Sequence, residues 1–260
     1  GINVYASVPV SEWMARQTPK RSLKIKGKKL ENTSFLAVDN PADLAIEAVR
    51  SLRTSLHFAM MEAGNNVLMI SGASPNAGKT FVTTNLAAVI AQSGQRVLFI
   101  DADMRKGYAH QIFHHSTEHG LSDILSGKST VQQGIKPVAA AGFDFLSRGA
   151  NPPNPAELLM HSRFQQLIEW ASQNYDLVLV DTPPILAVTD AAIIGRYAGT
   201  TLLVARFEQN TAKEMEVSVR RFEQSGIEIK GCILNGVIKK ASSYYGYGYS
   251  HYGYSYDDKK

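Results

Sequence analysis

The sequence predicts an α/β protein in which a doubly wound, mostly parallel sheet carries helices on both faces. Short apolar runs alternate along the chain with longer segments whose apolar residues recur at helical spacing, a pattern typical of β-α units. The apolar runs are short and bounded by Gly, Asp or Pro, as expected for strands buried on both faces. With 260 residues, 44% of them hydrophobic, the chain can build a sizeable core.

Six strands are expected, at 67–70, 97–100, 143–146, 177–180, 202–205 and 232–234. The run Leu-Val-Leu-Val at 177–180 is the clearest of them. Helices are expected at 81–92, 155–174 and 211–224. Apolar residues recur at helical spacing in the first of these helices, at Val82, Leu86, Val89 and Ile90. The second helix has an apolar stripe made of Leu159, Phe164, Leu167, Ile168 and Ala171.

Composition excludes several classes of protein. One cysteine, Cys232, cannot form a disulfide framework and fits a reducing compartment. No apolar run is long enough to cross a bilayer, and no signal-peptide pattern opens the sequence. The ordinary hydrophobic fraction and the net charge of +4 exclude global disorder. Because the sequence begins at Gly1 without a methionine, we expect it to be part of a longer protein.

The positive charge is concentrated in an N-terminal arm, residues 1–40. This arm has seven basic and three acidic residues, so 7 − 3 = +4 accounts for the whole net charge. The rest of the chain is balanced, which argues against a basic body that binds nucleic acid. Two interpretations of the arm remain open. It is either a solvated extension or a juxtamembrane segment that faces anionic lipid.

The last twenty residues, 241–260, differ from the rest of the chain. They contain no Leu, Ile, Val, Met, Phe or Trp, so they cannot contribute a core, and we expect a flexible tail. The tail holds seven of the eleven tyrosines: Tyr244, Tyr245, Tyr247, Tyr249, Tyr252, Tyr254 and Tyr256.

The segment 71–80, Ser-Gly-Ala-Ser-Pro-Asn-Ala-Gly-Lys-Thr, follows an expected strand and opens an expected helix. In such a phosphate-binding loop, backbone N–H groups and the helix N-terminus surround phosphate oxygens. Lys79 would reach the β- and γ-phosphates, and the Thr80 hydroxyl would coordinate Mg²⁺. The strict pattern has Gly where Ala73 stands, although Ala73 is small and Gly72 is adjacent. We therefore expect a P-loop NTPase whose ATP contacts come from Ser74, Asn76, Ala77, Gly78, Lys79 and Thr80.

Acidic residues end two of the expected strands. Asp181 follows the run at 177–180, and Asp101 and Asp103 follow the run at 97–100. Carboxylates at the carboxyl ends of parallel strands reach the ligand crevice and can hold Mg²⁺. A P-loop ATPase needs one such aspartate, so the additional pair leaves a carboxylate that can orient a nucleophile or accept its proton. The alternative role for Asp101 and Asp103 is to cap the next helix.

The loop at 71–80, Asp101-Ala102-Asp103, Asp181-Thr182-Pro183-Pro184 and the tyrosine-rich tail together resemble the bacterial tyrosine kinases. The resemblance runs from about residue 40 to the end, and the three motifs look like the Walker A, A′ and B motifs of that family. It implies a kinase domain over 41–240 that uses ATP and Mg²⁺. The implied catalytic residues are Lys79, Asp101, Asp103 and Asp181, and the implied Mg²⁺ site consists of Thr80 with the three aspartates.

The same resemblance implies a cellular setting. Family members of this kind are cytoplasmic domains that follow a transmembrane segment of an inner-membrane polysaccharide co-polymerase. They phosphorylate their own C-terminal tyrosines, and a low-molecular-weight phosphatase reverses the reaction. Partition and septum-site ATPases of the same fold carry a signature lysine where Ser74 stands. Eukaryotic-type kinases are excluded because the sequence has neither His-Arg-Asp nor Asp-Phe-Gly.

Glu47, Arg50 and Arg53 form a charged stripe on one side of an expected helix, beside an apolar face of Ile46, Val49, Leu52 and Leu56. Such a stripe is ordinarily solvated. The kinase family, however, uses a Glu-x-x-Arg-x-x-Arg stripe to pack subunits into a ring. We therefore expect a homo-oligomer in which the tail of one subunit enters the site of its neighbour.

Three further residues have weaker assignments. Tyr108 lies a few residues beyond Asp103 and is either a packing residue or an internal phosphorylation site. Arg148, after another expected strand, is the cation that such a phosphate would meet. Asn235 resembles the residue that meets the adenine in related ATPases.

The expected function is autophosphorylation of the tail tyrosines by MgATP, which would regulate polymerisation and export of capsular or extracellular polysaccharide. The alternative is an ATPase switch in which water is the phosphoryl acceptor and nucleotide state controls membrane or partner binding. Nucleic-acid binding by tail stacking is a third interpretation. We expect no nucleic-acid partner, because the only cations of the tail are Lys259 and Lys260.

Overall fold

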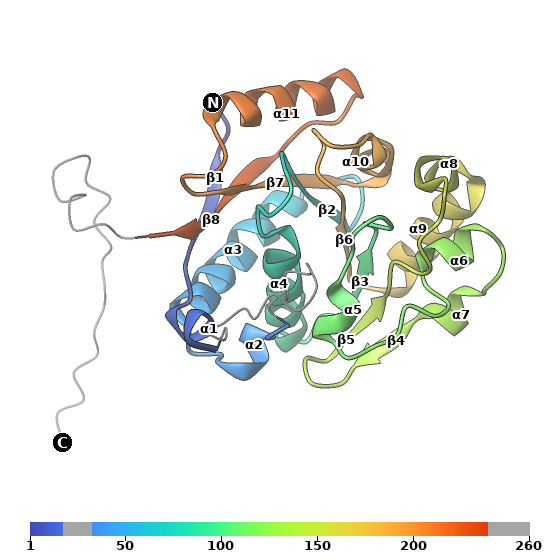
Figure 1. The fold of residues 1–260 in the computed structure, drawn as a ribbon, viewed down its shortest axis with the longest axis horizontal. Helices are drawn as coiled ribbons and strands as arrows, with labels where there is room; N and C mark the ends of the chain where they lie inside the picture. Colours follow the sequence, from blue (N-terminus) through green and yellow to red (C-terminus); the bar gives the residue numbers. More distant parts are fainter. Residues whose placement is uncertain (18–32, 239–260) are drawn as a thin grey trace, which may run out of the picture.

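The computed structural model describes residues 1–17 and 33–238. Eight strands form one sheet in the order β1-β8-β7-β2-β6-β3-β5-β4 (Figure 1). All neighbouring strands are parallel except β4 and β5. The strands are β1 (Val4–Pro9), β2 (Val67–Gly72), β3 (Val97–Asp101), β4 (Lys136–Val138), β5 (Phe143–Leu146), β6 (Leu177–Asp181), β7 (Thr200–Arg206) and β8 (Gly231–Val237).

Helices cover both faces of this sheet, as the sequence predicts. One face packs against α2 (Leu36–Asp39), α3 (Leu44–Met60), α4 (Lys79–Gln92) and α5 (Ala109–Ile112). The other face packs against α6 (Leu121–Leu125), α8 (Pro155–Met160), α9 (Ser162–Asn174), α10 (Asp190–Ile194) and α11 (Ala212–Gln224). The remaining elements are α1 (Glu12–Gln17), α7 (Val131–Gly134) and the 3-10 turn η1 (Gly195–Tyr197).

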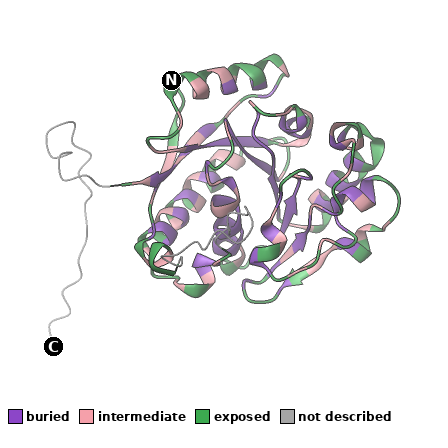
Figure 2. Cartoon of the chain, in the orientation of Figure 1, coloured by how far each residue is buried: buried purple, intermediate pink, exposed green. Residues whose placement is uncertain are grey.

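The central strands are buried on both faces (Figure 2). Along β2, Leu68 and Ile70 point into the core beneath α3 and α4, whereas Val67 and Met69 point into the core on the α9 side. This alternation explains why these strands read as continuous apolar runs. The doubly wound fold class is confirmed, and all six predicted strands are present.

Two predicted helices agree with the structure and one is divided. Residues 81–92 lie within α4, and 211–224 correspond to α11 with Thr211 as its N-cap. The expected single helix at 155–174 is wrong, because α8 ends before His161 and α9 starts after it. His161 is extended, and its Nδ1 accepts a hydrogen bond from the Arg163 N–H at 3.1 Å, so it caps α9. The predicted apolar stripe is nevertheless buried.

The segment expected to be an arm, 1–40, lies partly within the fold. Strand β1 forms the sheet edge beside β8, with Val8 fully buried. Phe35 and Leu36 are buried in the same core as α3 and α4. The apolar residues at both ends of the segment account for this packing, which the excess of positive charge obscured. Six of its seven basic residues fall in 18–32, outside the described residues.

Beyond those differences, β4 and the short helices α5, α6, α7 and α10 were not anticipated from the sequence. Within the described ranges, 1–17 and 33–238, no helix has the length and apolar character needed to cross a membrane. The predicted tail, 241–260, lies outside the described residues.

Candidate functional site

The predicted phosphate-binding loop joins β2 to α4 at the carboxyl edge of the sheet. Gly78 is the N-cap of α4 with φ +85°, a conformation that favours glycine, and a Cβ there would lie 2.0 Å from Asn235 Nδ2. A Cβ on Gly72 would lie 3.0 Å from Cδ of Lys79, so the lysine side chain runs close over this glycine. Ala73 is fully buried, so the position where the strict pattern has Gly holds a small side chain enclosed by the fold.

Thr80 and Asp181 meet directly. The Thr80 hydroxyl donates to Asp181 Oδ2 at 2.7 Å, and Asp181 is the last residue of β6. Burial raises the pKa of the Asp181 carboxyl, while the charge of Lys79 and the Thr80 hydrogen bond partly offset that rise. The structure therefore brings the loop and the predicted Walker B aspartate together.

Asp101 ends β3, the neighbour of β6, and lies opposite Asp181 in the parallel register. Burial, and then the nearby charges of Asp181 and Asp103, hold the pKa of Asp101 well above its ordinary value. Within the described part of the chain, Asp101 Oδ2 and Asp181 Oδ1 are buried without a hydrogen-bond partner. Buried, unpartnered carboxylate oxygens beside a hydroxyl are suitable ligands for Mg²⁺, so the residues present fit this ion.

Asp103 organises the turn that follows β3. Its Oδ1 accepts hydrogen bonds from the backbone N–H groups of Arg105 at 3.2 Å and Lys106 at 3.0 Å. Its own N–H donates to Asp101 Oδ1 at 3.2 Å. Asp103 thus caps a turn, while α5 begins later, after Tyr108. The turn packs tightly, because a Cβ on Gly107 would lie 2.4 Å from Asp101 Oδ2 and 2.5 Å from the Asp103 carbonyl oxygen.

Tyr108 and Arg148 lie at the end of this turn. Arg148 donates from Nε to the Gly107 carbonyl at 2.8 Å and from a terminal nitrogen to the Gly149 carbonyl at the same distance. Tyr108 is half-buried and packs against the core on the α3 side. The structure therefore places the predicted cation next to the residue that precedes the predicted phosphorylation site.

The β7 and β8 side supports the phosphate-binding loop. Asn235 is buried, and its Nδ2 donates to the Ala77 carbonyl at 3.1 Å. Asn210 donates to the Ser74 hydroxyl at 2.7 Å and accepts from the Arg206 N–H at 2.8 Å. Asn235 thus contacts the loop itself, and its adenine contact stays a prediction. Asn210 carries no motif and was missed in the sequence.

The charged stripe lies on α3, away from these carboxylates. Arg50 pairs with Glu47 at 3.0 Å and donates to the Pro41 carbonyl at 2.9 Å. Arg53 reaches across to the Val89 carbonyl of α4 at 3.2 Å. The three residues share one helix, and their role in an oligomer stays a prediction. The seven tail tyrosines fall outside the described residues.

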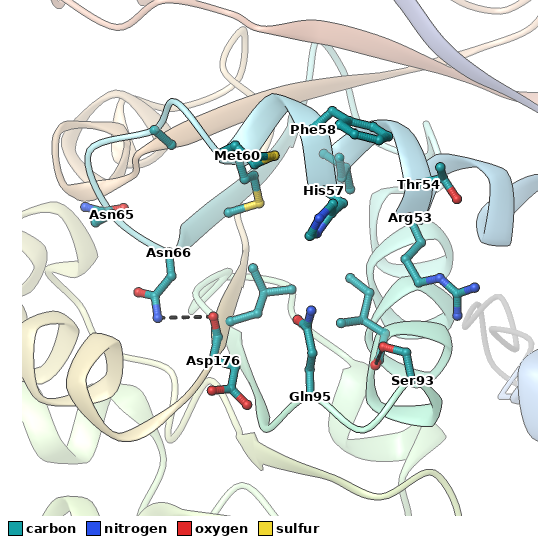
Figure 3. A pocket seen from close by; sticks show the side chains of 15 residues that line it. Arg53, Thr54, His57, Phe58, Met60, Asn65, Asn66, Ser93, Gln95 and Asp176 are labelled. Carbon is teal, nitrogen blue, oxygen red and sulfur yellow. Dashed lines mark hydrogen bonds between the residues drawn. The ribbon is translucent and has the colours of Figure 1, made fainter.

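A cavity of about 560 Å³ lies at the opposite, amino edge of the sheet (Figure 3). Arg53, His57 and Phe58 of α3 line one side, and Gln95 and Asp176, which precede β3 and β6, line the other. Both polar and apolar side chains line it, and it shares no residue with the predicted phosphate site, so it takes no part in the chemistry described above.

Comparison with known proteins gives consistent matches. The family model described as an AAA domain matches residues 65–214. The tyrosine-protein kinase etk of Escherichia coli K12 is 60% identical over 95% of this chain and 35% of that protein. The tyrosine-protein kinase wzc of Salmonella typhimurium is 60% identical over 100% of this chain and 36% of that protein. The chain thus spans about a third of the length of these relatives.

Solved structures agree with these relatives. The kinase domain of the Escherichia coli tyrosine kinase ETK superposes with a TM-score of 0.85 at 59% identity, over 96% of each chain. The BceF tyrosine kinase domain superposes with a TM-score of 0.80 at 41% identity, over 91% of this chain and 94% of that one. MinD from Pyrococcus horikoshii, complexed with Mg-ADP, shares the fold at a TM-score of 0.55 and 23% identity.

Proposed function

The chain belongs to the bacterial tyrosine-protein kinases, and on that basis we propose that it is a kinase domain that phosphorylates tyrosines of its own C-terminal tail. The observation that carries this proposal is the meeting of Thr80, Asp181 and Asp101 at the carboxyl edge of the sheet. ATP is the phosphoryl donor, bound by the loop at 74–80. The alternative acceptor is water, which would make the chain an ATPase switch.

The residues divide the work as follows. Lys79 and the loop N–H groups stabilise the phosphate charge of ATP. Thr80, Asp101, Asp103 and Asp181 would hold Mg²⁺, which when bound neutralises negative charge on the phosphates. Asp101 orients the tyrosine phenol and accepts its proton as the phenol oxygen bonds to the γ-phosphorus and the bond to ADP breaks. Tethering keeps the tail at a high local concentration.

The setting of the whole protein is part of the proposal. We propose that copies assemble into a ring through Glu47, Arg50 and Arg53, with each tail entering a neighbouring site. The intact protein would be anchored in the bacterial inner membrane by a part beyond this chain and would serve polysaccharide export. A low-molecular-weight phosphatase would reset the tail, and Tyr108 and Arg148 would form an internal phosphorylation switch. Full modification adds about −1.5 to −2 charges per tyrosine, enough to loosen a ring.

Phosphosite mapping by mass spectrometry tests the reaction. The chain is first dephosphorylated and then incubated with MgATP, alongside Lys79→Met. We expect phosphate on Tyr244–Tyr256 in the native chain and none in the variant, because Lys79 stabilises the transferring phosphoryl group. ATP hydrolysis without phosphotyrosine would reject the kinase and favour the ATPase switch.

A separate measurement of particle mass in solution tests the ring. If the variant with Glu47, Arg50 and Arg53 neutralised keeps the oligomeric mass of the native chain, the ring interface is rejected.

A further inference from the structure

Two loops at the carboxyl edge are joined by one ion pair. Arg105 lies in the turn after β3, and Asp190, the first residue of α10, ends the loop after β6. Arg105 Nε lies 3.0 Å from Asp190 Oδ2, and a terminal nitrogen lies 3.1 Å from Oδ1, so the pair is bidentate. The Asp190 side chain is 0% exposed, whereas that of Arg105 is 39% exposed. Bidentate pairing fixes orientation as well as distance.

Arg105 bonds to Asp190 through its side chain and to the Asp103 carboxylate through its backbone. Its guanidinium is fixed on α10, and its backbone N–H donates to Asp103 Oδ1 at 3.2 Å. The next N–H, that of Lys106, donates to the same oxygen at 3.0 Å. Arg105 therefore connects the Asp103 carboxylate, through its backbone N–H and its side chain, to α10.

The anchor is fixed relative to the phosphate-binding loop. In the loop after β6, the Ile185 N–H donates to the Gly72 carbonyl at 3.0 Å, and the Leu186 N–H donates to the Ala73 carbonyl at 3.2 Å. Arg221 of α11 donates to the Ile185 carbonyl at 3.2 Å. This loop leads directly to Asp190. A chain of contacts thus runs from the phosphate-binding loop through Asp190 and Arg105 to Asp103.

We propose that Arg105 and Asp190 are positioning residues that hold Asp103 in place relative to Asp181 and the phosphate-binding loop. The proposal rests on the proposed function, which gives Asp103 its role in holding Mg²⁺. Neither residue needs to touch the nucleotide. Losing either partner releases the turn at 101–108 from α10 and leaves the other side chain without its bidentate partner. The loss is more costly when Arg105 is replaced, because the carboxylate of Asp190 then stays buried without a cation.

The chain contains a matched control. Arg96 and Asp176 form another Arg–Asp pair, 3.2 Å apart, just before β3 and β6 begin. That pair joins the same two strands at the amino edge, far from the carboxylates, with side chains 68% and 43% exposed. Equivalent substitutions in the two pairs therefore separate positioning of Asp103 from a general loss of an Arg–Asp pair.

The experiment compares Arg105→Gln, Arg105→Lys and Asp190→Asn with the controls Arg96→Gln and Asp176→Asn in the full chain. ADP affinity is measured with and without Mg²⁺, and hydrogen exchange of the Arg105 and Lys106 amides is followed by NMR. We expect Arg105→Gln and Asp190→Asn to reduce the Mg²⁺-dependent gain in ADP affinity about 10–100-fold. Affinity without Mg²⁺ should stay within about twofold, since Asp103 is not part of the phosphate-binding loop.

Arg105→Lys keeps the charge but loses the fork, so it should fall between the native chain and Arg105→Gln. It also provides a folded variant if Arg105→Gln does not fold. Faster exchange at both amides in the Arg105 and Asp190 variants, with native exchange in the controls, supports the proposal. Native exchange and a native Mg²⁺-dependent gain in folded Arg105→Lys and Asp190→Asn would overturn it. If the native chain makes no phosphotyrosine, the kinase proposal fails while these binding and exchange measurements still decide the positioning role.

Discussion

Strands β3 and β6 lie side by side, and the charged residues at their amino ends are arranged differently from those at their carboxyl ends. Before they begin, Arg96 pairs with Asp176, so opposite charges meet where solvent reaches them. Where they end, Asp101 and Asp181 bring like charges together in a buried position. The amino end also borders the cavity of Figure 3, whereas the carboxyl end borders the phosphate-binding loop.

The two ends therefore differ in purpose: the charges at the amino end are compatible with a stable fold, whereas those at the carboxyl end are the ones that we propose to serve the reaction. Opposite charges at an exposed strand end need no ligand to be compatible with folding. Two buried carboxylates repel one another and lose hydration, and this arrangement persists only because the surrounding fold is stable enough to impose it. A bound cation would relieve the repulsion, so the Mg²⁺ site that we propose at the carboxyl end is already formed before the ion binds.

Asp101→Asn is the largest test of this comparison, because it should lower activity and raise stability together. Loss of a proton acceptor should reduce tyrosine phosphorylation about 10²–10⁴-fold. In the Mg²⁺-free protein, removing a buried carboxylate whose Oδ2 has no hydrogen-bond partner should increase the free energy of unfolding at pH 8 by about 1–3 kcal/mol. Denaturant titration and phosphotyrosine assay of the same preparation measure both effects.

The direction in which the fold changes the pKa values of the two aspartates determines how the stability of the chain depends on pH. The pKa values of Asp101 and Asp181 are raised in the folded state, so between the unfolded pKa of about 4 and the raised folded pKa these two carboxyls bind more protons in the folded chain than in the unfolded chain. The contribution of the two carboxyls to stability is therefore fully present below the unfolded pKa of about 4, and it is lost as the pH rises through their folded-state pKa values. Asp101→Asn should flatten this loss. An equally steep loss in the variant would show that the carboxylate pair does not set it.

Gly107→Ala is the second test, because it fills the space against which the carboxylates pack. The new Cβ would meet Asp101 Oδ2 at 2.4 Å and the Asp103 carbonyl oxygen at 2.5 Å, and the backbone oxygen cannot move alone. We expect a loss of about 1–3 kcal/mol in unfolding free energy from this overpacking. Gly64→Ala, near the amino edge, is the matched control, since its Cβ would have no neighbour within 4 Å. Equal behaviour of the two variants would remove the evidence for a tightly packed carboxyl edge.

The sequence predicts the parts of this site that depend on local pattern. The phosphate-binding loop and the aspartates at the ends of β3 and β6 are recognisable because each combines an apolar run with a few polar residues directly after it. The parts that depend on contacts between distant residues were missed. Arg105 and Asp190 are 85 residues apart, and Ser74 and Asn210 are 136 apart, so no spacing in the sequence marks either pair. Strand β1 was hidden for a related reason, since its partner β8 lies at the other end of the described chain.

Asp176→Asn is the smallest test, and its pH dependence should have the opposite sign. The Arg96 backbone N–H donates to Asp176 Oδ2 at 2.7 Å, and this hydrogen bond, together with the Arg96 side chain, lowers the pKa of Asp176. A lowered folded pKa contributes stability above the unfolded value, and this contribution is lost as pH falls below about 4. Exposure keeps it small, so we expect the melting temperature at pH 7 to fall by no more than about 2–4 °C. The difference in melting temperature between the variant and the native chain should shrink with added salt and vanish in acid. Thermal scans from about pH 3, below the ordinary carboxyl pKa, to about pH 8 would measure it. A larger loss that survives in acid would mean that Asp176 supports the amino edge by packing around the cavity, and the contrast between the two strand ends would then not be one of charge.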